Sequence, residues 1–209
     1  MVSETQTACV LALHFDLAQP KLRSRILKLL VANLAKRKDH LCTGFVGTPY
    51  LNHALSDNGC HELAGKVFLQ EDFPSWLYPV KMGATTIWER WNSLQPDGSF
   101  SSAGMNSFNH YAYGSIGSWM YQKLGGLQIV KPGYKKSRIA PMPIQGIDSA
   151  KAVVKTVYGI LSCEWKRENG KLSVDITVPC NTSAVVKLPG KKKEFIVGSG
   201  NYHYKNLKI

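Results

Sequence analysis

The sequence predicts an α+β chain in two parts, a helical part over about residues 1–126 and a small antiparallel β part over residues 137–209. In the first part, apolar residues recur at the spacing of amphipathic helices. In the second part, two β-rich runs with alternating polarity flank the dipeptide Asn169-Gly170, which is a strong hairpin signal. Proline and glycine between the two parts predict a linker over residues 127–136.

The helices of the first part have recognisable start and stop signals. Thr48 followed by Pro49 indicates a helix start, because threonine is a good N-cap and proline suits the first helical turn. Gly125-Gly126 ends the last helix of this part. The predicted helices cover residues 8–17, 21–38, a short stretch from Thr48, about 60–70, and about 107–124. Loops are predicted over residues 41–50, 72–76 and 93–106. The predicted strands of the second part cover residues 160–165, 172–178, 184–188 and 194–197.

Composition excludes several classes of protein. The formal charge of +12 raises nucleic-acid binding as an alternative, but the lysines and arginines fall into separate groups, so no nucleic-acid partner is expected. The five cysteines lack CxxC spacing, so we expect free thiols, no metal site and no cofactor. No apolar run reaches the length of a membrane span, so no membrane partner is expected.

Residues 83–92 are the candidate active site. Within this stretch Trp88 and Trp91 flank Glu89 and Arg90. Aromatic faces can stack on a sugar while a carboxylate handles protons and water. Alternatively, Thr86 and Glu89 match a capping box, in which Glu89 only satisfies backbone N–H groups at a helix start. A carboxylate at a helix N-terminus is stabilised in its charged form, which suits a general base.

Two further residues are candidates for contact with a ligand. Trp76 lies in an aromatic loop and is either a ligand platform or a cover over the edge of the core. His110 lies in the first turn of the helix predicted to begin near Ser107. A single histidine is more often structural, but at a helix start it would share a rim with Glu89 if the two helices ran side by side in the same direction.

With these residues in place, the chain resembles the C-terminal portion of the inverting bacterial α-L-rhamnosidases among the glycoside hydrolases. The resemblance covers nearly the whole chain and is carried by several segments in the same order. These segments are residues 41–50, 73–76, 83–92 and 107–126, with Tyr158-Gly159 and Glu164-Trp165 in the β part. The resemblance implies a partial six-fold α/α barrel over residues 1–126, a linker over 127–136 and a C-terminal β-sandwich over 137–209.

The resemblance also implies roles for individual residues. Glu89 would be the general base that activates water, and His110 would contact the rhamnose. Trp76, Trp88 and Trp91 are further candidate substrate contacts because aromatic faces can stack on a sugar. Inverting hydrolysis needs two carboxyl groups separated by about 6.5–9.5 Å. No segment here resembles the one that supplies the family's general acid, so the chain is expected to be inactive alone and to act as part of a longer enzyme.

Other expectations concern partners and compartment. The substrate implied by the resemblance is a rhamnose-containing glycoside or polysaccharide. An incomplete barrel exposes apolar helix faces, so self-association or association with an upstream catalytic fragment is expected. The alternative function is a non-catalytic carbohydrate-binding or interaction module. No secretory signal is recognised near Met1, so the compartment is cytoplasmic as the chain stands, and periplasmic or secreted within a longer precursor.

Overall fold

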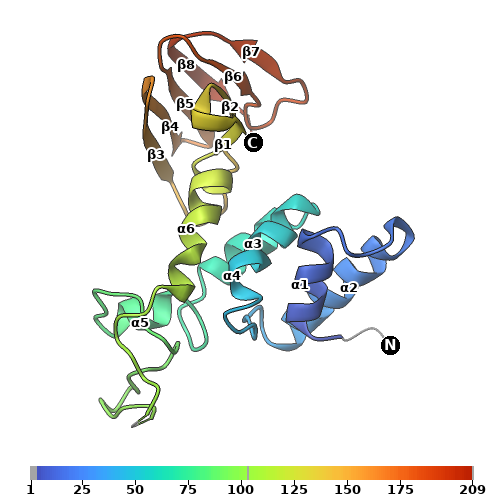
Figure 1. Ribbon diagram of the computed structural model, residues 1–209, viewed down its shortest axis with the longest axis vertical. Helices are drawn as coiled ribbons and strands as arrows, with labels where there is room; N and C mark the ends of the chain where they lie inside the picture. The colour runs from blue at the N-terminus through green and yellow to red at the C-terminus, as the bar shows by residue number, and fades with distance from the viewer. Residues whose placement is uncertain (1–3, 103, 209) are drawn as a thin grey trace. The chain divides into compact units, whose positions relative to one another are not determined.

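A computed structural model of the protein describes residues 4–102 and 104–208. The chain forms two compact units, Met1–Ile116 and Gly117–Ile209. The first unit is helical and the second consists mainly of β-strands, as Figure 1 shows. Within the described residues, no helix has the length and apolarity needed to cross a membrane.

The first unit is built from short helices that pack in pairs. Helix α1 packs against α2 and α3, and α3 packs against α4 (Figure 1). In α2, Ile26, Leu30 and Leu34 are buried at intervals of four residues, which gives the apolar stripe that the sequence predicts. The elements are α1 (Gln6–His14), α2 (Pro20–Lys36), α3 (Thr48–Asp57), α4 (His61–Phe68), α5 (Leu77–Lys81) and the 3-10 helix η1 (Ala112–Ser115). Helix α5 was not predicted, because its five residues are too few to show a periodic pattern.

Buried polar residues fix the loop between α2 and α3. Gln6 is fully buried, and its side chain donates to the His40 carbonyl at 3.2 Å and accepts from the Cys42 N–H at 2.7 Å. Thr48 begins α3, as predicted, but Gly47 precedes it and Thr48 is not an N-cap. Instead, the Thr48 hydroxyl donates to the Gly44 carbonyl at 2.9 Å. This loop carries Phe45 toward the candidate active site.

The second unit contains two four-stranded sheets with the orders β1-β2-β6-β7 and β3-β4-β5-β8. All neighbouring strands are antiparallel except β2 and β6, which are parallel. The strands are β1 (Leu127–Lys131), β2 (Lys136–Ile139), β3 (Ser149–Thr156), β4 (Gly159–Glu168), β5 (Lys171–Val178), β6 (Ser183–Val186), β7 (Phe195–Val197) and β8 (Gly200–Leu207). Short helical turns are α6 (Ile116–Trp119), η2 (Met120–Leu124) and η3 (Pro132–Tyr134).

Local sequence signals explain parts of this unit. Asn169 and Gly170 have φ angles of 50° and 71°, so they form the predicted turn between β4 and β5. Trp165 is fully buried in β4 and donates its indole N–H to the Leu124 carbonyl at 2.7 Å. Residues 127–136, expected to be a linker, instead contain β1 and η3, and β1 pairs with β2. Leu127 is buried in the core of the unit, which explains why this segment is ordered.

Candidate active site

Two chain segments that are distant in sequence pair at the candidate active site. The Glu89 N–H donates to the Ser107 carbonyl at 2.9 Å, and the His110 N–H donates to the Ile87 carbonyl at 2.8 Å. This antiparallel pairing places Glu89 and His110 on adjacent segments. The predicted base and the predicted sugar-contacting residue therefore lie on neighbouring, hydrogen-bonded segments.

The predicted capping box does not form. Residues 83–92 are irregular, and no helix begins at Thr86. The Thr86 hydroxyl instead donates to the Phe108 carbonyl, across the pairing. Consecutive β-branched residues, Thr85 to Ile87, are stiff at χ1 and disfavour a helical turn here. Our expectation that a helix dipole stabilises the Glu89 charge is therefore wrong, and Glu89 is positioned by backbone pairing.

The two oxygens of the Glu89 carboxylate differ in their hydrogen bonding. Its Oε2 atom accepts a hydrogen bond from the Ser107 N–H at 2.8 Å. Its Oε1 atom makes no hydrogen bond to any residue in the described part of the chain. The side chain is half-buried. One oxygen is thus fixed by the protein backbone while the other remains available to a water molecule.

His110 has a defined ring orientation and a defined acceptor nitrogen. Its ring stacks on Phe45, with centroids 4.8 Å apart and planes 17° from parallel. Its Nδ1 atom accepts from the Ala112 N–H at 3.3 Å, just before η1 begins. Because Nδ1 accepts, the neutral ring carries its proton on Nε2. His110 therefore offers an Nε2–H donor, as a hydroxyl-binding residue would. Its helix begins at Ala112, later than the predicted start near Ser107.

The three candidate tryptophans are mostly buried. Trp76, Trp88 and Trp91 expose 8%, 5% and 8% of their surfaces. Trp91 stacks on Tyr113 at 3.7 Å and meets Trp76 edge-on at 5.3 Å, while the Trp76 indole N–H donates to the Tyr113 carbonyl at 3.0 Å. Trp88 packs edge-on against Phe108 at 5.1 Å. These contacts form an aromatic core beneath the paired segments.

A pocket of about 240 Å³ opens beside this aromatic core. Its wall is mostly apolar, with the side chains of Thr85, Thr86 and Arg90 as polar groups, which is the general character of a small-ligand site. Glu89 and His110 do not line it. The lining residues are Trp76, Pro79, Val80, Ala84, Thr85, Thr86, Ile87, Trp88, Arg90, Trp91 and Tyr113.

The loop that follows the candidate base holds one acidic residue, Asp97. The Ser99 hydroxyl donates to its Oδ1 atom at 2.6 Å, and the Ser99 N–H donates to the same atom at 2.9 Å. These bonds lower the pKa of Asp97, the hydroxyl having the larger effect. A carboxyl with a lowered pKa stays ionised at neutral pH and is a poor proton donor. Asp97 is therefore unsuited to the role of general acid.

Sequence reasoning missed the residues that hold the candidate base and histidine. Phe45 was part of a predicted loop, but nothing in that loop indicates that its ring stacks on His110. Ser107 was placed only at a helix start, whereas its backbone bonds twice to Glu89. The Arg90 guanidinium Nε donates to the Met105 carbonyl at 3.0 Å and ties the following loop to the site. The glycine-rich composition around Phe45 was the one available signal for an unusual loop.

Two known domains match the chain in sequence. The bacterial alpha-L-rhamnosidase 6 hairpin glycosidase domain matches residues 1–124. The bacterial alpha-L-rhamnosidase C-terminal domain matches residues 126–203. The helical unit is thus part of a six-hairpin domain. The predicted fold class, a partial α/α barrel followed by a β-sandwich, is confirmed.

Individual relatives give the same assignment. An alpha-L-rhamnosidase of Formosa agariphila is 40% identical over 210 residues, covering 100% of this chain and 23% of that protein. The crystal structure of Streptomyces avermitilis alpha-L-rhamnosidase complexed with L-rhamnose has a TM-score of 0.93 and 39% identity, over 97% of this chain and 21% of that one. The crystal structure of the native enzyme from Aspergillus terreus has a TM-score of 0.94 and 39% identity, over 98% of this chain and 24% of that one. The chain spans less than a quarter of each of these proteins, and over that span it belongs to the bacterial α-L-rhamnosidase family.

Proposed function

We propose that this chain supplies the water-activating half of an α-L-rhamnosidase active site, which hydrolyses terminal α-L-rhamnosyl residues with inversion. In this proposal Glu89 is the general base and His110 binds a hydroxyl of the rhamnosyl unit. The observation that carries it is the pairing of residues 87–89 with residues 107–110, which places the two side chains on adjacent segments. The substrate class is that of the relatives, which are alpha-L-rhamnosidases.

The free Oε1 atom of Glu89 suits the role of base. A general base must lie within hydrogen-bond reach of the water whose proton it removes. The Ser107 N–H holds Oε2, so the carboxylate cannot turn away, and Oε1 can accept the proton. The water oxygen then attacks the anomeric carbon from the face opposite the leaving group, while an acid protonates the leaving oxygen. The proton thus moves from water to Glu89, and the glycosidic bond breaks as the new C–O bond forms.

His110 suits the role of a sugar contact. Its Nε2–H is a donor, and an imidazole held in a fixed plane can bind one sugar hydroxyl with a defined direction. Trp76, Trp88 and Trp91 are proposed to contribute only where they line the neighbouring pocket, because all three are mostly buried and Tyr113 stacks on Trp91. They shape the apolar wall rather than forming an open stacking platform.

The general acid is proposed to come from a part of the enzyme that this chain does not contain. Asp97 has a lowered pKa and is unsuited to the role. The chain covers 21% of the Streptomyces avermitilis enzyme and 24% of the Aspergillus terreus enzyme, which leaves room for that part elsewhere. Association with such an upstream catalytic fragment, or self-association through exposed apolar faces, remains part of this proposal. Ile87 and Val80, which are 42% and 60% exposed at the pocket, belong to such a face.

A hybrid enzyme tests the proposal. The purified chain alone should not measurably hydrolyse an aryl α-L-rhamnoside. A hybrid in which this chain replaces the matching portion of the Streptomyces avermitilis enzyme should hydrolyse it, and NMR should show the β-anomer of rhamnose as the first product. Hydrolysis by the chain alone at enzymatic rates would contradict the assignment of the acid to another segment, and first release of the α-anomer would contradict inversion.

The second candidate is a non-catalytic carbohydrate-binding module. It is favoured by the tryptophan-lined pocket and by the ordered donor on His110, neither of which needs a general acid. Calorimetry of the chain with L-rhamnose separates the two functions when it is combined with the hybrid assay. Binding by the chain, together with an inactive but folded hybrid, would favour the module.

A further inference from the structure

The positive charge of the chain lies almost wholly in its second unit. Residues 117–209 contain 16 of the 26 lysines and arginines but only 5 of the 14 acidic residues. Residues 1–116 contain 10 basic and 9 acidic residues and are nearly neutral. A domain with such an excess of one sign attracts polyanions over a distance of several ångströms. The charge therefore belongs to the β-sandwich and not to the candidate active site.

Lysines from three neighbouring strands surround a hollow on one sheet of this unit. The hollow has a volume of about 480 Å³ and lies over β4, β5 and β8. Its cations are Lys166 on β4, Lys171 on β5 and Lys205 on β8, and we name it the lysine hollow. Its polar lining also includes Ser173, His203 and one carboxylate, that of Glu168. The remaining lining residues are Asn169, Leu172 and Asn206.

Two of these ammonium groups are not engaged with the protein. In the described part of the chain, neither Lys171 nor Lys205 forms an ion pair, whereas Lys166 lies 3.1 Å from Glu164. The pairing of β5 with β8 shifts register beside Ser173, and Asn206 adopts a φ of 57° at this irregularity. Such bulges re-aim side chains and are frequent beside functional sites. The free cations and the bulge therefore occur in the same hollow.

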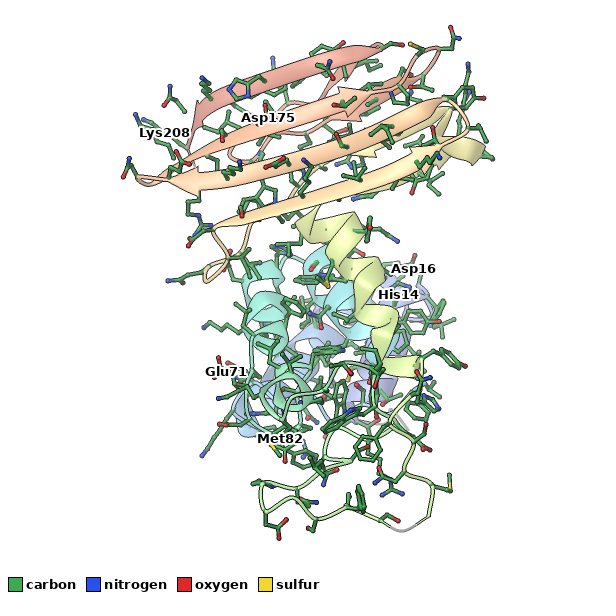
Figure 2. The ribbon with its side chains drawn as sticks, turned by 90° about the vertical axis from the view of Figure 1, so that its left-hand side faces the viewer. His14, Asp16, Glu71, Met82, Asp175 and Lys208 are labelled. Carbon is green, nitrogen blue, oxygen red and sulfur yellow. The ribbon has the colours of Figure 1, made fainter. Side chains whose placement is uncertain are left out.

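A second hollow of about 330 Å³ lies beside the first and shares His203 with it. Glu164 and Asp175 stand directly opposite each other across β4 and β5, and both line this hollow. Figure 2 shows Asp175 on the broad face of the sheet. Opposed like charges destabilise a sheet, and cations offset this cost here. Lys151 lies 3.0 Å from Glu164, and His203 bonds to Asp175.

The Glu164 carboxylate in the second hollow is ionised at neutral pH. The hydrogen bond from Lys151, followed by that from Lys166, lowers the pKa of Glu164. An ionised carboxylate is a strong acceptor for the hydroxyl groups of a sugar. The face thus places a group of anion-binding lysines next to a group of hydroxyl-binding carboxylates.

We propose that this face binds an acidic polysaccharide, with a carboxylate or sulfate group in the lysine hollow and hydroxyls of the adjoining sugar on Glu164 and Asp175. A polysaccharide whose anionic groups are separated by uncharged, hydroxyl-bearing parts fits this arrangement of lysines beside carboxylates. Duplex DNA carries one charge for about every 1.7 Å of its axis, so it would press phosphates against the two carboxylates. The choice of a glycan as the ligand rests on the proposed rhamnosidase function. Binding to this face requires no hydrolysis, so a failure of the binding proposal is distinguishable from a failure of the proposed hydrolytic function.

Binding assays with the full 209-residue chain test this proposal. The probes are polygalacturonate for the carboxylate, dextran sulfate for the sulfate and neutral dextran as control, compared by calorimetry at a fixed salt concentration. At least one anionic glycan should bind and neutral dextran should not. The double variant Lys171→Gln/Lys205→Gln should weaken binding by about twofold to thirtyfold, since two exposed ion pairs of a few tenths to one kcal/mol each are lost. The matched control is Lys191→Gln/Lys192→Gln, which removes the same charge from an exposed turn of the same unit.

Three outcomes would overturn the proposal. Equal binding of neutral dextran would remove the role of charge. An equal loss of affinity in the control variant would mean that overall charge, and not the lysine hollow, attracts the glycan. Tighter binding of duplex DNA than of either anionic glycan at the same salt would assign the face to nucleic acid. Circular dichroism of both double variants checks that the sandwich remains folded.

Discussion

Glu89 and Ser107 are joined by two hydrogen bonds, one from the Glu89 N–H to the Ser107 carbonyl at 2.9 Å and one from the Ser107 N–H to Glu89 Oε2 at 2.8 Å. The pair closes a small ring across the two active-site segments. Glu89 is thus a structural residue and a candidate base at once. The two roles use different atoms, which makes them separable by mutation.

The first prediction separates these roles through stability. Glu89→Gln keeps an oxygen that accepts from the Ser107 N–H, so urea unfolding should change by less than about 0.5 kcal/mol. Glu89→Ala removes the acceptor and should lower the free energy of unfolding by about 1 kcal/mol. Equal stability of the two variants would mean that the bond from Ser107 does not hold the segments together.

The second prediction concerns the buried tryptophans. Trp91 stacks on Tyr113 and meets Trp76 in the core of the first unit. Trp91→Ala should therefore lower the free energy of unfolding by about 3–5 kcal/mol, measured by urea denaturation. Trp88→Ala should behave similarly, because Trp88 is also buried. A Trp91→Ala variant as stable as the original chain would show that the ring faces solvent and is free to stack on a sugar.

The third prediction concerns the ring beneath His110. Phe45 is 43% exposed, so Phe45→Ala should cost little stability. Without the Phe45 ring the His110 imidazole is no longer held in one orientation. A stacked pair of aromatic rings contributes about 0.5–1.5 kcal/mol of interaction free energy. In the active hybrid enzyme, KM for an aryl rhamnoside should rise by roughly twofold to tenfold while kcat changes less. Phe73→Ala, at an exposed phenylalanine in the loop before α5, is the matched control. A loss confined to kcat would place Phe45 in a different role.

The fourth prediction concerns thiol reactivity. Burial raises the pKa of the Cys163 thiol to about 12, so this thiol carries its proton at all ordinary pH values. The thiolate is the reactive form, and Cys163 in the folded chain should not react with a thiol reagent at pH 8. Cys42 and Cys180 are exposed and should react within minutes. Mass spectrometry identifies the labelled sites, and urea should make Cys163 reactive. Rapid labelling of Cys163 without denaturant would contradict its place in the core.

The sequence predicted those features that depend on neighbouring residues. The Asn169-Gly170 turn is set by two residues that tolerate positive φ angles. The stripe on α2 follows from the periodic spacing of Ile26, Leu30 and Leu34. The C-terminal half of the predicted helix after Ser107 likewise forms, as α6 and η2.

The features that depend on distant partners were not predictable from the sequence. The Thr86 to Glu89 capping pattern fails because Phe108 and Ser107 compete for the same polar side chains. β8 was not predicted, because Tyr202 and Tyr204 alternate with polar residues over only a short stretch, and its pairing with β5 completes it as a strand. Exposure of the tryptophans was also unpredictable, since Tyr113 covers Trp91 from a distant part of the chain.

The most direct test of the proposed chemistry is the Glu89→Gln variant in the active hybrid enzyme. An amide retains the bond from Ser107 but cannot accept the proton of the attacking water, so kcat should fall by at least about a hundredfold while affinity for L-rhamnose stays unchanged. Glu71→Gln, at an exposed residue bonded to Lys81, is the matched control and should leave kcat unchanged. Near-original kcat for Glu89→Gln would contradict the assignment of Glu89 as general base.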